Sequence, residues 1–201
     1  MSIIVEIIGT TISPWAVPTI RGVCTAIMGL AVLSLCTAIL IDFRRFDHRK
    51  GQKGEKKSLV ATGTMFAFFG LYYIALLLKP LAFPIHNITM IIGTIMVVAG
   101  VVINILARFQ LGSNWANHIK IYSNHKLITT GFYSISRHPL YTSLFLSLFG
   151  GALAYSSWLA AALTAFVFIP MMNYRAKQEE ELLAKEFPEY KKYIKKVRRF
   201  I

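Results

Sequence analysis

Long apolar runs limit the fold of this sequence more than any other feature. A helix needs about 20 apolar residues to cross roughly 30 Å of hydrocarbon, and three runs reach that length. A fourth apolar block, Leu140 to Tyr174, is interrupted by YSSW and could form two short helices joined by a tight turn, or one spanning helix and a buried one. We predict an all-α membrane bundle with five transmembrane helices, the last two forming a hairpin. The expected spans are residues 17–41, 59–78, 88–107, 140–154 and 158–174.

The composition agrees with a multi-pass membrane protein. Hydrophobic residues make up 55% of the 201 residues, charged residues only 15%, and the mean hydropathy is +0.55, which lies outside the range of ordinary soluble domains. The net charge of +13 does not indicate nucleic-acid binding, because the positive residues lie between the apolar runs. We expect one membrane domain over residues 1–201.

The positions of Lys and Arg predict the topology, because the loops rich in them stay on the cytoplasmic side. Residues 42–58 contain seven, residues 107–139 contain four and residues 175–201 contain nine, which leaves Arg21 and Lys79 for the opposite side. Five crossings put all three segments on one side, whereas four would separate them. We therefore predict an N-terminus outside and a C-terminus in the cytoplasm, in a bacterial inner membrane or the endoplasmic reticulum.

The C-terminal segment spaces apolar residues three or four apart among Lys and Arg, at Leu183, Phe187, Tyr190, Ile194, Val197 and Ile201. This pattern is typical of a basic amphipathic helix on an anionic lipid surface, with Pro188 in its first turn. The alternative is a solvated, charged tail. We expect an interfacial amphipathic helix that contacts membrane lipids.

Two polar groups flank the fourth apolar block. GFYSISRHPLY, residues 131–141, places His138 directly before Pro139, which can mark the start of a helix. At the other end, NYRAKQEEE places Arg175 and Glu179 four residues apart on one helix face. Each group alone could be an ordinary interfacial belt or ion pair. A hairpin would bring the two groups together, and charges near the membrane need partners or a ligand.

Three stretches carry a resemblance: LGSNW at 111–115, HKLITTGFYSISRHPLY at 125–141 and YRAKQEEELLAKEFPEYKKY at 174–193. They resemble the integral-membrane methyltransferases of the isoprenylcysteine carboxyl methyltransferase and phospholipid methyltransferase family, whose hallmark is Arg-His-Pro-x-Tyr, a hydrophobic hairpin and a Glu-Glu pair preceded by an Arg. The resemblance covers the C-terminal half, so residues 108–201 are expected to form the cofactor-binding part.

The resemblance implies methyl transfer from S-adenosyl-L-methionine to a lipophilic small molecule or a lipidated acceptor. Arg175 and Glu179 are the expected catalytic residues. Arg175, Trp115 and Asn114 are expected to contact the acceptor. The residues expected to bind the cofactor are His138, Tyr141, Glu179, Glu180, Gly131, Tyr133 and Arg137.

The chemical nature of the acceptor stays open at this stage. A carboxylate is already nucleophilic at pH 7, so Arg175 would only need to orient it. An amine or a thiol must lose a proton, and Glu179 or His138 could accept it. Carboxylate O-methylation is the leading hypothesis, with amine N-methylation or thiol S-methylation as alternatives within the family.

Other functions and sites were weighed as well. A membrane reductase that uses NADPH could share this C-terminal half, and a small non-enzymatic carrier would explain the topology but not the ordered motifs. No metal is expected, since His118 and His125 lack ligand partners at suitable spacing. Trp115 could instead be a membrane-interface anchor. Asn104, inside an apolar run, predicts an interhelical hydrogen bond. The sequence does not predict an oligomeric state.

Overall fold

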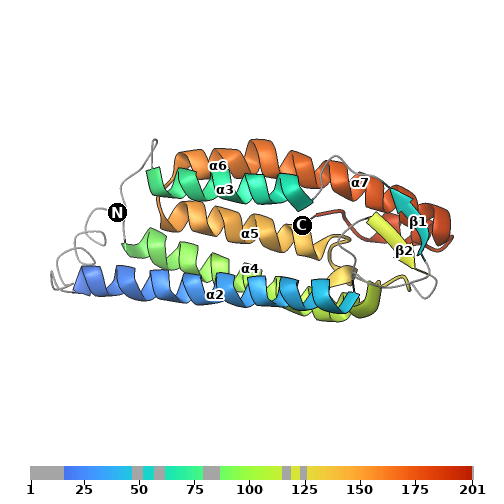
Figure 1. Ribbon diagram of the computed structural model, residues 1–201, viewed down its shortest axis with the longest axis horizontal. Coiled ribbons are helices and arrows are strands. Elements are labelled where there is room, and N and C mark those ends of the chain that lie inside the picture. The colour runs from blue at the N-terminus through green and yellow to red at the C-terminus, as the bar shows by residue number, and fades with distance from the viewer. Residues whose placement is uncertain are drawn as a thin grey trace.

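The computed structural model describes residues 16–46, 52–56, 62–78, 87–114, 119–122 and 126–200. Long helical elements lie side by side along the long axis of the molecule (Figure 1). They are α2 (Ala16–Phe46), α3 (Thr62–Leu78), α4 (Asn87–Leu111), α5 (Pro139–Ala154) and a continuous helix made of α6 (Trp158–Leu163), the π-helical turn η3 (Thr164–Phe168) and α7 (Ile169–Glu186).

Three of these helices are long and apolar enough to cross a membrane, within Thr19–Asp42, Asn87–Leu111 and Trp158–Glu186. The apolar helices Thr64–Leu78 and Pro139–Ala154 are shorter. Large apolar side chains also point outward, including Phe66, Phe109 and Phe166, which are 70%, 75% and 80% exposed. A surface of this kind suits lipid rather than water. The protein is an integral membrane protein, and the exact number of crossings stays a prediction.

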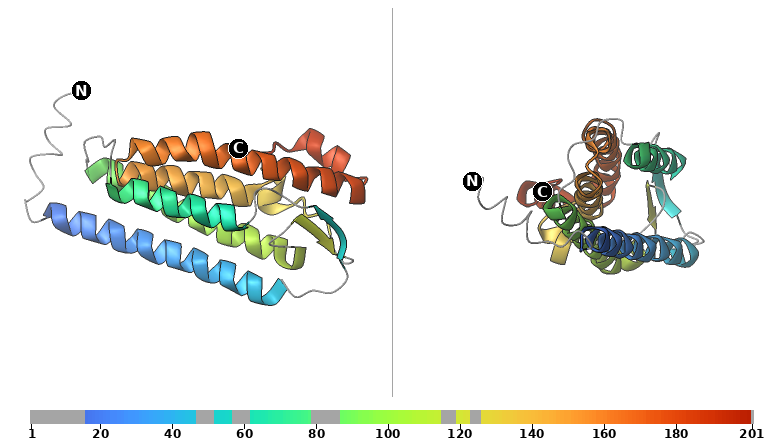
Figure 2. Two further views of the ribbon diagram at one scale, coloured as in Figure 1. Left: turned by 45° about the horizontal axis from the view of Figure 1, so that its top comes forward. Right: turned by 90° about the vertical axis from the view of Figure 1, so that its left-hand side faces the viewer.

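Helices α4 and α5 pack together through glycines. A Cβ atom on Gly93 would lie 2.5 Å from the backbone nitrogen of Ala154 and the backbone oxygen of Gly150, and one on Gly100 would lie 2.6 Å from the carbonyl oxygen of Ser143. Only glycine lets two backbones approach this closely. Helix α2 packs on the other side of α4, as the two views in Figure 2 show.

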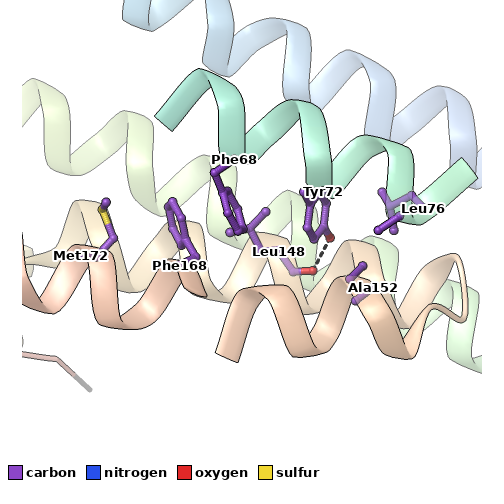
Figure 3. Close-up of a cluster of buried hydrophobic side chains, with 9 residues drawn as sticks. Phe68, Tyr72, Leu76, Leu148, Ala152, Phe168 and Met172 are labelled. Atoms are coloured by element: carbon purple, nitrogen blue, oxygen red, sulfur yellow. Dashed lines mark hydrogen bonds between the residues drawn. The ribbon is translucent and has the colours of Figure 1, made fainter. Parts of the chain in front are cut away.

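Aromatic packing joins α3 to the helix formed by α6 and α7. The rings of Phe68 and Phe168 stack with centroids 4.6 Å apart, and the hydroxyl of Tyr72 donates to the carbonyl oxygen of Leu148 on α5 (Figure 3). All four residues are buried. This cluster fixes α3 beside the hairpin, and Met65 on the same helix lies against Arg175.

The predicted hairpin is confirmed. Helix α5 begins at Pro139 and ends at Ala154, and α6 begins at Trp158, the last residue of YSSW. Ser156 adopts a φ of 54°, and Ser157 caps α6 by accepting from the amide of Ala160. The π-helical turn precedes Pro170, which has no amide hydrogen to donate. The second helix continues to Glu186, beyond the predicted end of the span at residue 174, because Ala, Gln, Glu, Leu and Lys are strong helix formers.

A short strand pair among the described residues departs from the predicted all-α class. Strands β1 (Gln52–Lys56) and β2 (Ile119–Tyr122) pair antiparallel, with Glu55 opposite Lys120. They lie at the end of the bundle where α7 projects and pack against that helix (Figure 1). The two strands are far apart in sequence, so no local turn motif predicts that they pair.

The C-terminal segment differs from the predicted amphipathic helix. Helix α8 (Tyr190–Lys196) is short, and Pro188 lies in the turn before it rather than in its first turn. Tyr190 and Tyr193 are 1% and 8% exposed, and the hydroxyl of Tyr193 donates to the carbonyl oxygen of Tyr133. The aromatic face of this helix therefore contacts protein, while its lysines are exposed.

Asn104 makes the predicted interhelical contacts. Its amide nitrogen donates to the carbonyl oxygen of Leu140 at 3.0 Å and to the hydroxyl of Ser143 at 2.7 Å, both on α5. Its amide oxygen accepts from Arg108, which also pairs with Asp42 of α2 at 2.9 Å. This chain of contacts ties three helices together at the start of α5.

Candidate functional site

The loop before α5 is shaped by a glycine and a buried tyrosine. The turn η2 (Gly131–Ser134) begins at Gly131, whose φ is +60°, and a Cβ atom there would lie 2.3 Å from Gln110. The amide of Phe132 donates to the side chain of Gln110 at 3.0 Å. Tyr133 is buried, and its hydroxyl lies 3.4 Å from the carbonyl oxygen of Ala107. These contacts anchor the loop to α4.

His138 and Tyr141 lie at the start of α5, as the position of Pro139 predicts. His138 occupies the N-cap position without a side-chain capping hydrogen bond, and Pro139 lies in the first turn of the helix. The two rings stack almost in parallel, with centroids 5.4 Å apart and an interplanar angle of 4°. His138 is 7% exposed. The sequence therefore forms a fixed aromatic pair at this end of the bundle.

Glu179 of α7 receives donors from two elements. The hydroxyl of Tyr141 donates to Oε1 at 2.6 Å, and Nε of Arg175 donates to the same atom at 3.1 Å. Nδ1 of His138 lies 3.4 Å from Oε2. The structure thus brings together four residues that the sequence placed at opposite ends of the hairpin, which confirms that the two polar groups meet.

Glu180 faces a different set of partners. Its Oε1 atom lies 3.1 Å from Nε2 of His138 and 3.4 Å from a terminal nitrogen of Arg137. Two guanidinium nitrogens of Arg199 donate to the two carboxylate oxygens of Glu180, at 2.9 Å and 2.7 Å. The side chain of Glu180 is 9% exposed. His138 therefore bridges the two glutamates, with one ring nitrogen near each carboxylate.

The position of His138 between two carboxylates favours its protonated form. Burial alone lowers the pKa of His138, but hydrogen bonds and charge from Glu179 and Glu180 outweigh burial and raise this pKa above its usual 6.5. Both ring nitrogens face acceptors, so the protonated imidazolium, which has two N–H donors, satisfies both. While both ring nitrogens of His138 donate to these carboxylates, neither nitrogen is free to accept a proton from substrate.

This arrangement predicts a pH-dependent stability. Because the pKa of His138 is raised in the folded state, its contribution is fully present below about pH 6.5 and is lost as the pH rises through the folded-state pKa. We expect the apparent Tm of the purified protein to fall between pH 6 and pH 9, and to fall less in His138→Gln. Thermal unfolding in detergent at each pH measures the difference, and parallel curves for the two proteins would contradict it.

Three further residues lie at this site and were not predicted from the sequence: Arg199, Phe200 and Asn173. Arg199 also donates to the side-chain oxygen of Asn173 at 2.8 Å, and the ring of Phe200 lies 6.0 Å from that of His138. In the sequence, Arg199 is one of several basic residues in a charged segment. No periodicity or motif distinguishes it from its solvated neighbours, so only the folded chain identifies it.

Other predicted site residues have contacts outside the acidic pair. The hydroxyl and carbonyl groups of Tyr133 contact α4 and α8, so its contacts hold the loop and the C-terminal segment. The side chain of Asn114 accepts from the amide of Lys126 at 2.9 Å, which links η1 (Gly112–Asn114) to the following segment. Trp115 lies outside the described residues. The roles assigned to these three residues stay predictions.

Comparisons with known proteins show what part of this chain is similar to. Residues 91–185 match the model of the isoprenylcysteine carboxyl methyltransferase family. A nickel-cobalt-cadmium resistance protein, NccN, of Alcaligenes xylosoxydans xylosoxydans is 38% identical over 92 residues, which are 45% of this chain and 43% of that protein. The protein-S-isoprenylcysteine O-methyltransferase of Saccharomyces cerevisiae is 31% identical over 110 residues, which are 53% of this chain and 46% of that protein.

A solved structure shares the fold. The eukaryotic intramembrane Ras methyltransferase ICMT (isoprenylcysteine carboxyl methyltransferase) superposes with a TM-score of 0.62 at 21% identity, covering 89% of this chain and 64% of that one. The chain spans about half the length of the curated relatives that it matches. The matched region contains α5, the hairpin turn, Arg175 and both glutamates. Residues 91–185 of this chain are thus similar to the isoprenylcysteine carboxyl methyltransferase family, and the chain shares the fold of the solved ICMT structure.

Proposed function

We propose that this chain is an S-adenosyl-L-methionine-dependent methyltransferase that methylates the carboxylate of a lipophilic acceptor at the membrane edge. The observation that carries the proposal is the position of His138 between Glu179 and Glu180. Both ring nitrogens face carboxylates, and Glu179 already accepts from Arg175 and Tyr141. These groups already pair with one another, so none of them is free to remove a proton from an acceptor. This favours an acceptor that is already ionised.

The residues at this end of the bundle fit the proposed cofactor. Nε and one terminal nitrogen of Arg137 are buried and have no hydrogen-bond partner among the described residues, so a carboxylate such as that of the methionyl group would satisfy them. The stacked rings of His138 and Tyr141 offer a flat surface for adenine. Glu179 and Glu180 are suitable acceptors for hydroxyl and ammonium groups. Bound S-adenosyl-L-methionine would supply the sulfonium methyl group.

Arg175 is the residue that we assign to the acceptor. Its side chain is 9% exposed, and its guanidinium lies between Glu179 and the sulfur of Met65 on α3. It therefore lies between the acidic pair and an apolar helix, where a lipophilic molecule can approach from the bilayer. A guanidinium orients a carboxylate through paired hydrogen bonds without exchanging a proton. Arg175 would position the acceptor carboxylate, because displacement at a sulfonium methyl group mainly requires the correct orientation of the nucleophile.

We also propose five crossings, with the N-terminus outside and the C-terminus in the cytoplasm. The end of α2, the start of α3, the end of α4, the start of α5 and the end of α7 lie at one end of the bundle, together with both strands and α8 (Figure 1). Three segments rich in Lys and Arg connect or follow these ends. This arrangement supports a cytoplasmic position for the site. The soluble cofactor would then reach the site from the cytoplasm.

The proposal is tested with full-length protein purified in detergent. We expect calorimetric titration to show binding of S-adenosylhomocysteine, and labelled S-adenosyl-L-methionine to transfer its methyl group to a farnesylated cysteine with a free carboxylate. The methyl ester of the same molecule is the matched control and should not be methylated. Transfer to phosphatidylethanolamine or to a lipophilic thiol instead would refute the carboxylate acceptor. Binding of NADPH without binding of S-adenosylhomocysteine would refute the methyltransferase.

A further inference from the structure

The segment Arg198–Phe200 returns from α8 to the start of α5. Ser136 and Arg198 form a parallel bridge, in which the amide of Arg137 donates to the carbonyl oxygen of Arg198 at 2.9 Å. The carbonyl oxygen of Arg199 accepts from the amide of His138 at 3.2 Å and from the hydroxyl of Ser136 at 2.9 Å. The segment is therefore held beside the residues proposed to bind the cofactor.

Two side chains of this segment point into the site. Arg199 pairs with both oxygens of Glu180 and with Asn173. The ring of Phe200 packs against His138 and lies 5.2 Å from the ring of Phe145. Arg199 and Phe200 thus contact both the acidic side and the aromatic side of the cluster.

The acceptor capacity of Glu180 leaves little room for a further donor. Its Oε1 atom faces His138, Arg137 and Arg199, and its Oε2 atom faces Arg199. A carboxylate offers about four lone-pair positions, and Arg199 alone uses two of them. If Glu180 is to accept from a cofactor, as the proposed function requires, departure of Arg199 would free two acceptor positions, one on each oxygen.

We propose that Arg199 and Phe200 form a latch that closes the cofactor site and is displaced when the cofactor binds. This inference rests on the proposed function. In the closed state the guanidinium of Arg199 satisfies Glu180, and in the open state a cationic or hydroxyl group of the ligand does so. The latch sets the fraction of molecules that can bind, and apparent affinity falls in proportion to that fraction.

The contacts of Arg199 suit an exchange of this kind. Its side chain is 26% exposed, whereas that of Glu180 is 9% exposed. When Arg199 withdraws, His138 and Arg137 remain beside Glu180. The buried carboxylate is therefore never left without a counter-charge, which would be costly. Departure of Arg199 breaks an ion pair that is open to solvent on one side, and such pairs are weaker than fully buried ones.

The experiment compares Arg199→Gln with Arg198→Gln. Arg198 is the matched control, because its side chain is exposed and its carbonyl oxygen makes the backbone contact. We expect Arg199→Gln to bind S-adenosylhomocysteine roughly tenfold more tightly than the wild type in calorimetric titration. Arg198→Gln should stay within about twofold of the wild type. Phe200→Ala, which removes the other half of the latch, should also bind more tightly.

A second measurement is independent of the cofactor. In Arg199→Gln, trypsin should cleave after Lys195 and Lys196 faster than in the wild type, because the segment that follows them is released from Glu180. Unchanged cleavage, or weaker cofactor binding by Arg199→Gln with wild-type Tm, would overturn the latch and leave the methyltransferase proposal intact. Failure of every form to bind S-adenosylhomocysteine would instead overturn the proposed function, and the latch with it.

Discussion

Arg175→Ala is expected to lower kcat/KM for the carboxylate acceptor by about 100- to 1000-fold while S-adenosylhomocysteine binding changes by less than about threefold. Arg175 contacts Glu179 and Met65 but is not among the partners of Glu180 described above. Removing it takes away the group that orients the acceptor. Glu179 keeps Tyr141 and His138 as donors, so the cofactor side of the cluster stays in place.

The controls for Arg175 separate its charge from its geometry. Lys177→Ala changes an exposed cation two residues away on α7 and should leave kcat/KM unchanged. Arg175→Lys keeps the charge but loses the planar fork, so we expect only partial recovery. Methyl transfer from labelled cofactor and titration with S-adenosylhomocysteine are the two measurements. If Arg175→Ala loses cofactor binding, and its rate of methyl transfer falls only as much as its cofactor binding does, Arg175 would be assigned to the cofactor and not to the acceptor.

Glu180→Gln is expected to weaken binding of S-adenosylhomocysteine by roughly 10- to 100-fold, because a charge-assisted hydrogen bond contributes about 1.5–3 kcal/mol. The amide keeps the shape of the side chain but cannot balance the positive charges of His138, Arg137 and Arg199. Calorimetric titration measures the loss. The exposed residue Glu186, at the end of α7, provides the control Glu186→Gln.

The result for Glu180 also bears on the latch. If Glu180→Gln binds S-adenosylhomocysteine as tightly as the wild type, Glu180 does not contact the cofactor. The cofactor and Arg199 would then not compete for Glu180. Size-exclusion chromatography and the apparent Tm show whether the variant is folded. A folded variant with weaker binding is the expected result.

Much of the helical arrangement follows from local sequence. Apolar runs, Pro139 and the YSSW turn predicted where the first helix of the hairpin begins and ends and where the second begins, because each signal acts over a few residues. The end of the second helix, at Glu186 rather than at residue 174, was not predicted. The strand pair could not be predicted in this way. Residues 52–56 and 119–122 are joined by no short loop, and QKGEK has a composition typical of an exposed basic loop.

The candidate site, like the fold, could be predicted only in part from the sequence. His138, Tyr141, Arg175 and the glutamates could be predicted to meet, since a hairpin returns its two ends to the same membrane surface and helix spacing puts Arg175 and Glu179 on one face. Which glutamate faces which partner could not be predicted. That choice depends on the rotation of α7 against α5 and on the close backbone contact of α4 and α5 at Gly93 and Gly150.

The sequence by itself determined a membrane-embedded helical hairpin with an arginine, a histidine and an acidic pair at one end, because hydrophobicity, helix period and proline geometry are local properties. Only the tertiary structure decided that the segment Arg198–Phe200 returns to this site and that Arg199 pairs with Glu180. Pairing between an exposed-looking arginine and a buried carboxylate depends on the path of the chain after α8. That path is set by the packing of Tyr190 and Tyr193 rather than by any signal around Arg199 itself.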